Sequence, residues 1–191
     1  MPSLSSGKLS RILRRFRRNK RGSAAIEFGI VALPFFVMLF AIFEFALMFL
    51  AGEVLATASQ DSARLIFTNQ AQDQKFDALA FKKDLCARLG NTLFDCQAGA
   101  LDKGVMIDVK VVPQFTTVSA SDLAPPIDAN GELTGLSYTS PPPGSTVIVR
   151  TFYKWPLLVN FDGYSLASVA GQQFRYLTAT AAFRVEPGGA P

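Results

Sequence analysis

The chain has 191 residues, 49% of them hydrophobic, and a formal net charge of +4. That length provides one modest domain plus an anchor segment. The sequence contains no histidine, which excludes catalytic Ser-His and Cys-His arrangements, and two cysteines alone do not fill a tetrahedral zinc shell. We therefore expect neither an enzyme nor a metal or cofactor site.

The charge is distributed unevenly along the chain. Residues 1–22 carry eight Lys and Arg side chains and no acidic residue, whereas the remainder has 11 basic and 15 acidic residues. A basic arm first suggests nucleic-acid binding. This one directly precedes a long apolar run, so the tendency of basic segments to stay in the cytoplasm explains it better. We expect a cytoplasmic leader over residues 1–22 and no nucleic-acid partner.

The apolar run extends from Ala24 to Ala51 and is interrupted only by Glu27, Gly29, Pro34 and Glu44. A bilayer-spanning helix needs about 20 apolar residues, so this run is long enough to cross with some tilt. The apolar core of a secretory signal usually has about 7–15 residues, which is much shorter. The run is therefore interpreted as a retained membrane anchor.

The two carboxylates in this run are far apart. Glu44 follows Glu27 by 17 residues, about 25 Å along a helix axis, so both fit near opposite edges of the hydrocarbon. The helical pattern continues to Thr68, which predicts one helix over residues 23–68, about 70 Å long.

Beyond that helix the pattern changes from helical to alternating. A second helix is predicted from about Lys75 to Leu89, with Gly90 as its cap. Pro- and Ser-rich sequence over 114–144 predicts a long surface excursion. The predicted strands are Val105–Val111, Thr146–Lys154 and Gln173–Val185. The expected fold class is α+β: a long N-terminal transmembrane helix that continues into a small exported domain, residues 69–191, with a three-stranded antiparallel sheet.

Both cysteines, Cys86 and Cys96, follow the apolar run. If the N-terminus is cytoplasmic, they lie on the far side of the membrane, where disulfides form. We expect a Cys86–Cys96 disulfide; the alternative is two separate buried thiols.

The opening of the helix reads Gly22-Ser23-Ala24-Ala25-Ile26-Glu27-Phe28. Glu27 in an apolar helix has two interpretations. It is either a boundary glutamate that reaches the headgroups, or a carboxylate used in assembly. If the bond between Gly22 and Ser23 is cut, a new α-amine appears four residues before Glu27. In a bundle of such helices, the amine of one subunit and the carboxylate of another attract strongly in a low dielectric.

This opening, followed by an apolar run containing Leu33-Pro34, resembles the TadE-like pseudopilins (minor pilins) of tight-adherence (Tad/Flp) pilus systems in Gram-negative bacteria. The cysteine pair and the ending from Ala179 to Pro187 are also similar to that family. The resemblance implies cleavage by a membrane prepilin peptidase, with Gly22 and Ser23 as the processing site and Glu27 and Phe28 as assembly residues. The implied partners are other pilins and pseudopilins, the Tad secretion machinery and the inner membrane.

The resulting prediction is a non-enzymatic minor pilin that takes part in assembly or export of adhesive pili. It would be a single-pass inner-membrane protein with a cytoplasmic N-terminus and a periplasmic C-terminal domain, and it could enter surface pili. The alternative is an unprocessed bitopic inner-membrane protein whose periplasmic domain scaffolds a secretion complex.

Overall fold

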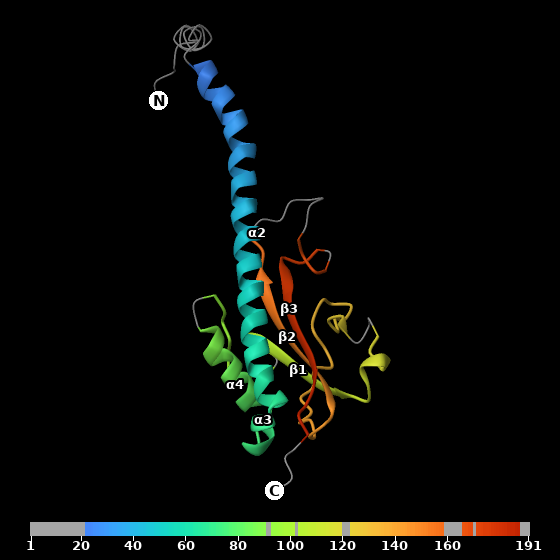
Figure 1. The fold of residues 1–191 in the computed structure, drawn as a ribbon. Coiled ribbons are helices and arrows are strands. Elements are labelled where there is room, and N and C mark those ends of the chain that lie inside the picture. Colours follow the sequence, from blue (N-terminus) through green and yellow to red (C-terminus); the bar gives the residue numbers. More distant parts are fainter. Residues whose placement is uncertain are drawn as a thin grey trace, which may run out of the picture. The chain divides into compact units, whose positions relative to one another are not determined.

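The computed structural model describes residues 22–90, 93–101, 103–119, 123–158, 166–169 and 171–187 (Figure 1). The predicted leader, apart from Gly22, lies outside these residues. The chain divides into two compact units at Glu44: residues 1–43 form the N-terminal unit and residues 44–191 form the unit called the head below. Helix α2 (Ser23–Phe67) contributes its first part to one unit and its second part to the other.

In the N-terminal unit, α2 exposes apolar side chains all around. None of residues 24–43 is buried, and the helix continues through Pro34. The helix is long and apolar enough to cross a membrane. A helix that is apolar on every side is stable when lipid or other helices surround it. The prediction of a long apolar N-terminal helix is confirmed.

In the head, α2 becomes amphipathic. Its buried side has helical spacing and includes Ala51, Leu55, Ala58, Ser62 and Ile66. The outward side becomes polar from Glu53 onward. This division is typical of a helix with one face on a core and the other in water.

Two further helices follow. The predicted linker over residues 69–74 contains a short helix, α3 (Gln70–Asp73). Helix α4 (Ala78–Leu89) starts three residues later than predicted, because Asp77 caps it by accepting the N–H of Ala80. Gly90 ends it with φ 66°, as its predicted capping role requires.

The three predicted strands form one antiparallel sheet in the order β1-β2-β3. The strands are β1 (Val105–Val112), β2 (Thr146–Pro156) and β3 (Phe174–Arg184). Strand β2 runs past its predicted end at Lys154, since Trp155 pairs with Arg175 and Pro156 with Phe174. Proline is tolerated there because it occupies the last position of the strand. The predicted α+β fold with a three-stranded antiparallel sheet is confirmed.

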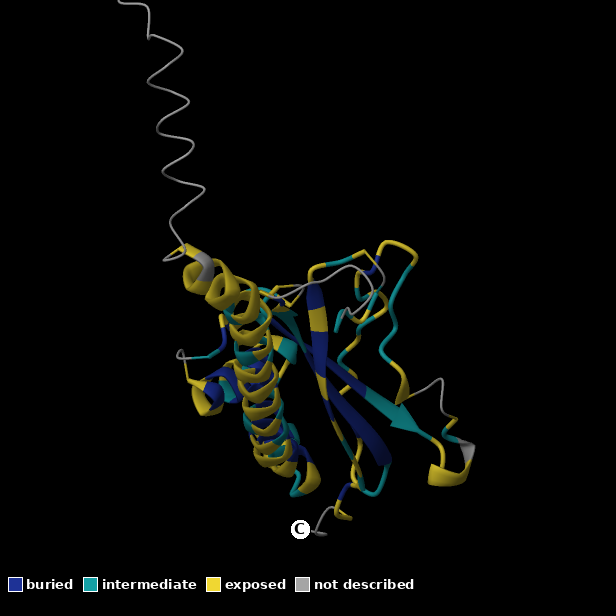
Figure 2. Cartoon of the chain, turned by 90° about the horizontal axis from the view of Figure 1, so that it is seen from above, coloured by how far each residue is buried: buried dark blue, intermediate teal, exposed yellow. Residues whose placement is uncertain are grey.

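One face of the sheet packs against the helices and forms the main core. Val105, Val109, Val147 and Val149 are fully buried there, as are Leu55, Ile66, Phe81 and Leu85 on α2 and α4. Figure 2 shows buried residues concentrated on the strands and on the side of the helix toward them. Burying a side chain of this size contributes roughly 1.5–3 kcal/mol, so this face holds the head together.

The second face of the sheet is also covered, which the sequence did not predict. Met106, Phe152, Phe174 and Tyr176 form a smaller core there, packed by Ile127, Leu133 and Leu136 from the excursion over 114–144. The excursion also pairs with the edge of β1, where the Val109 N–H donates to the Ser137 carbonyl. It is therefore a cover for the sheet rather than a surface loop.

Candidate functional site

The predicted processing and assembly residues lie together because they are consecutive at the start of α2. Gly22 is exposed and directly precedes the helix, and Ser23 is its first residue. Glu27 follows one turn later and is exposed, as is Phe28, with 70% of its surface accessible. Gly22, Glu27 and Phe28 are thus accessible to another molecule.

The fold does not require glycine at position 22. A Cβ placed there would meet no atom within 4 Å, and the backbone lacks the positive φ that favours glycine. Gly104 differs: its φ is 65°, and an added Cβ would lie 2.4 Å from the Asp95 carbonyl oxygen. A requirement for glycine at position 22 would therefore come from a binding partner and not from this chain.

The second carboxylate of the apolar run has a different environment. Glu44 is only 5% exposed, and its Oε1 accepts the backbone N–H of Leu158, just after β2. The sequence placed Glu44 at an edge of the hydrocarbon; the structure adds that the head encloses it. A buried carboxylate that accepts a backbone N–H recovers part of its desolvation cost.

The two cysteines form a disulfide between α4 and the loop before β1, with 5.7 Å between their Cα atoms. Lys82, one turn before Cys86, is fully buried, and its Nζ donates to the carbonyls of Ala100 and Lys103. Sequence reasoning missed Lys82, although its position on the Cys86 side of α4 was a signal. The disulfide and this lysine hold the loop in place together.

A buried ion pair lies under the excursion. Arg150 Nη2 of β2 is 2.6 Å from Asp108 Oδ2 of β1, and both side chains are at most 3% exposed. Arg150 also donates to the Ala124 carbonyl, and Asp108 accepts the Ser137 N–H. The pair therefore attaches the excursion to the sheet. Sequence reasoning missed this pair because its partners are 42 residues apart, and a charged side chain in an alternating strand gives no sign of being buried.

The carboxylates Asp77 and Asp84 have helical spacing, which is typical of a solvated helix face. Asp77 instead caps α4, and Asp84 accepts a hydrogen bond from Ser62 Oγ on α2 and pairs with Arg88. These contacts are structural. Among the residues that the structure describes, no group of three or more His, Cys, Asp or Glu side chains is arranged to hold a metal ion.

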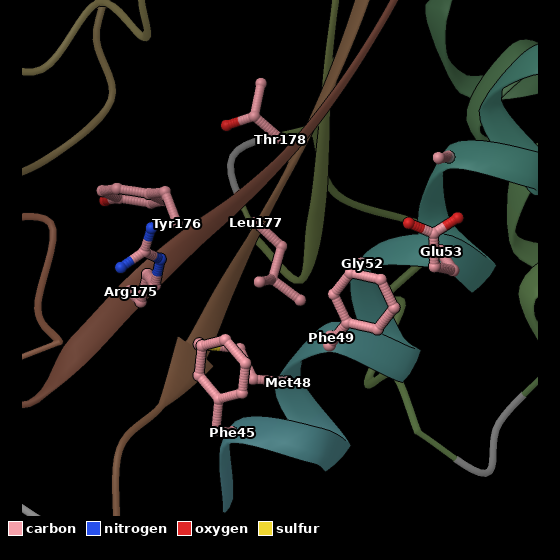
Figure 3. A pocket seen from close by; sticks show the side chains of 10 residues that line it. Phe45, Met48, Phe49, Gly52, Glu53, Arg175, Tyr176, Leu177 and Thr178 are labelled. Atoms are coloured by element: carbon pink, nitrogen blue, oxygen red, sulfur yellow. The ribbon is translucent and has the colours of Figure 1, made fainter.

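A groove of about 530 Å³ lies between α2 and β3 in the head (Figure 3). Phe45, Met48 and Phe49 line it from the helix, and Leu177 lines it from the strand. Glu53 and Arg175 are its charged residues. This mixed lining suits an apolar ligand that lies next to a polar environment. The lining residues provide no pair of side chains that could act as general acid and general base in catalysis.

Comparison with known families finds a match at the start of the described chain. Residues 22–64 match the family model described as TadE-like protein. No curated protein and no solved structure matches the chain. The matched segment begins at Gly22 and covers almost all of α2, so the resemblance predicted from the opening motif is confirmed over these residues: the segment 22–64 is similar to TadE-like proteins.

Proposed function

We propose that this protein is a non-enzymatic minor pilin, cleaved between Gly22 and Ser23, that takes part in assembly or export of Tad/Flp-type pili. The observation that supports it is the start of the family match at Gly22, the residue directly before α2. TadE-like pilus proteins are structural proteins, in agreement with the absence of histidine.

In this proposal residues 1–22 form the cytoplasmic leader, 23–68 the membrane and stalk helix, and 69–191 the exported domain. The eight basic residues of the leader keep the N-terminus inside. A prepilin peptidase then binds the exposed Gly22 at the membrane face. A side chain at this residue would crowd the enzyme, although it would crowd nothing in the chain itself.

Cleavage exchanges the basic leader for a single α-amine on Ser23. Glu27, one turn along α2, is exposed and can pair with the Ser23 amine of a neighbouring subunit. In a medium of low dielectric this attraction is several times stronger than in water. It fixes the axial register between neighbouring helices and gives the carboxylate a role in assembly. Partners are the prepilin peptidase, other pilins and the Tad secretion machinery.

The test separates cutting from assembly. Gly22→Val should leave the leader attached, which an immunoblot and the N-terminal mass of the purified protein will show. Gly29→Val is the matched control, because Gly29 lies on the exposed first part of α2 and, like Gly22, has no atom within 4 Å of an added Cβ. Normal cleavage of Gly22→Val would contradict the processing site, and an intact leader in the wild-type protein would favour the unprocessed scaffold.

Glu27→Gln should be cleaved and inserted but should fail to support piliation, because removing one charge of a desolvated pair costs about 3–5 kcal/mol. Glu53→Gln, on the exposed polar side of α2, is the matched control and should support normal piliation. If Glu27→Gln also supports normal piliation, Glu27 is only a boundary residue.

A further inference from the structure

The head begins before the apolar surface of α2 ends. Glu44 is already buried by the head, yet the exposed side chains that follow it on the helix stay apolar: Phe45 and Phe49 at the groove, and Leu47 and Leu50. Phe49 is 63% exposed. Within the head, the first charged residue on the exposed side of α2 is Glu53. For about two turns, therefore, one side of α2 carries the head while the other presents apolar side chains to the surroundings.

The length of the apolar surface indicates what those surroundings are. From Ala24 to Leu50 a helix rises about 40 Å, whereas the hydrocarbon core of a bilayer is about 30 Å thick. An upright helix would therefore have residues 44–50 in the interfacial layer, and a tilted helix would place them deeper. In either case the start of the head lies at the depth of lipid.

A second segment of the head is held at the same level. The Leu158 N–H donates to Glu44 Oε1, which fixes the end of β2 beside the start of the head helix. Leu157 is buried, but Leu158 is 85% exposed, the largest exposure among the large apolar side chains that the structure describes. An apolar side chain that is this exposed beside an apolar helix surface suits lipid better than water.

We propose that the base of the head, defined as Phe45, Leu47, Phe49, Leu50 and Leu158, is embedded in the adjoining leaflet of the bilayer. The partner of this surface is phospholipid, because the base continues in sequence the apolar surface of the candidate membrane span. The inference rests on the membrane anchoring of the proposed function and goes beyond it, since an anchor alone would leave the exported domain in water.

This placement also gives Glu44 a role. At this depth an exposed carboxylate would be costly. Enclosure by the head keeps it away from the acyl chains, and its hydrogen bond holds Leu158 at the membrane. The groove of Figure 3 has the same order along α2, with Phe45 and Phe49 first and Glu53 one turn later. It matches the change from hydrocarbon to headgroups.

Tryptophan fluorescence in the full chain tests the proposal. Trp155 is the only tryptophan, so each reporter is introduced in a Trp155→Phe background. Leu158→Trp reports on the base and Leu33→Trp on the anchor, where Leu33 is exposed. Phe115→Trp reports on the opposite end of the head. Phe115 comes shortly after the last residue of β1, which pairs with Thr146. Thr146 in turn pairs with the last residue of β3, and the chain just after β3 bonds to Phe67. Phe67 is the last residue of α2, so Phe115 lies at the end of the head that is far from Glu44.

The proteins are reconstituted in phosphatidylcholine–phosphatidylglycerol nanodiscs with plain or brominated acyl chains, and mobility on non-reducing gels checks the disulfide of each variant. We expect brominated lipid to quench Leu33→Trp and Leu158→Trp strongly and to leave Phe115→Trp unchanged. The emission maximum of Leu158→Trp should also lie at a shorter wavelength than that of Phe115→Trp.

Each other outcome overturns the proposal in a distinguishable way. If only Leu33→Trp is quenched, the anchor is in the membrane but the base of the head is in water. Blue-shifted but unquenched emission from Leu158→Trp would mean that a second copy of the chain covers the base. Quenching of Phe115→Trp as well would mean that the whole head adsorbs to lipid. If Leu33→Trp is not quenched, the membrane anchoring of the proposed function itself is wrong.

Discussion

Of the described residues, the head buries four that are charged, whereas the described part of the N-terminal unit, residues 22–43, exposes its one charged residue. The head buries Glu44, Lys82, Asp108 and Arg150, and each has a hydrogen-bond partner within the chain. The N-terminal unit leaves Glu27 exposed among exposed apolar side chains. The head therefore completes its own interior, whereas the N-terminal unit has a surface suited to lipid and to neighbouring helices.

This difference teaches that one helix can belong to two environments. Helix α2 is continuous from Ser23 to Phe67, yet its surroundings change at Glu44. Changes in the head should therefore alter its stability, and changes in the N-terminal unit should alter assembly while leaving the head unaffected. Stability is measured here by chemical unfolding of the full chain in detergent, with Trp155 of the head as the reporter.

The largest expected effect comes from breaking the buried ion pair. Arg150→Met leaves Asp108 buried without its main partner, which should lower the free energy of unfolding by about 3–5 kcal/mol. We expect the lower end, because Lys110 Nζ lies 3.7 Å from Asp108 Oδ2. Adding Asp108→Leu should recover part of the loss, since no charge is then left unpaired. Glu27→Gln should leave unfolding unchanged; an equal loss there would contradict the comparison.

The disulfide should have a slightly smaller effect. Replacing Cys86 and Cys96 by serine opens a loop with a sequence separation of 10 and should cost about 3 kcal/mol in the chain-entropy model. Labelling of the unreduced, denatured wild-type protein should find no reactive thiol. Two reactive thiols would show that the bond does not form in the cell.

The third prediction concerns the two carboxylates of the apolar run directly. Glu44→Ala removes the acceptor of the partly buried Leu158 N–H, and loss of this hydrogen bond should cost about 1 kcal/mol. Glu44→Gln keeps an oxygen at this position and should cost less. If Glu44→Ala unfolds like wild type, the head does not depend on this hydrogen bond.

The smallest expected effect is a pH dependence of the stability that the second face of the sheet contributes. Burial, followed by the nearby Glu132 carboxylate, raises the pKa of Tyr176 to about 12, and the Tyr176 hydroxyl donates to the Gly131 carbonyl. An unfolded tyrosine has a pKa near 10. The contribution of Tyr176 to the free energy of unfolding is therefore complete below about pH 10 and is lost as the pH rises toward about 12. Unfolding measured across this window should show a steeper loss for wild type than for Tyr176→Phe; parallel curves would contradict the prediction.

The sequence by itself determined the elements and the motif. An apolar run without polar periodicity predicts a membrane-compatible helix, alternation predicts strands, and Asp77 and Gly90 mark the ends of α4, although the predicted start overlooked the cap at Asp77. The opening from Gly22 to Phe28, in which the processing and assembly residues are proposed, was readable because such a motif is local. These features depend on the identity and spacing of neighbouring residues, which a single sequence contains.

Only the tertiary structure decided which polar residues are buried. Asp108 and Arg150 are 42 residues apart, and Glu44 and Leu158 are 114 apart. A charged side chain in an alternating strand predicts a solvent-facing position, and it can be buried only when a distant segment supplies a partner. Here the excursion over 114–144 covers the second face of the sheet, and the end of β2 encloses Glu44. Such long-range partners leave no periodic signal in the sequence, because their effect arises only when the chain has folded.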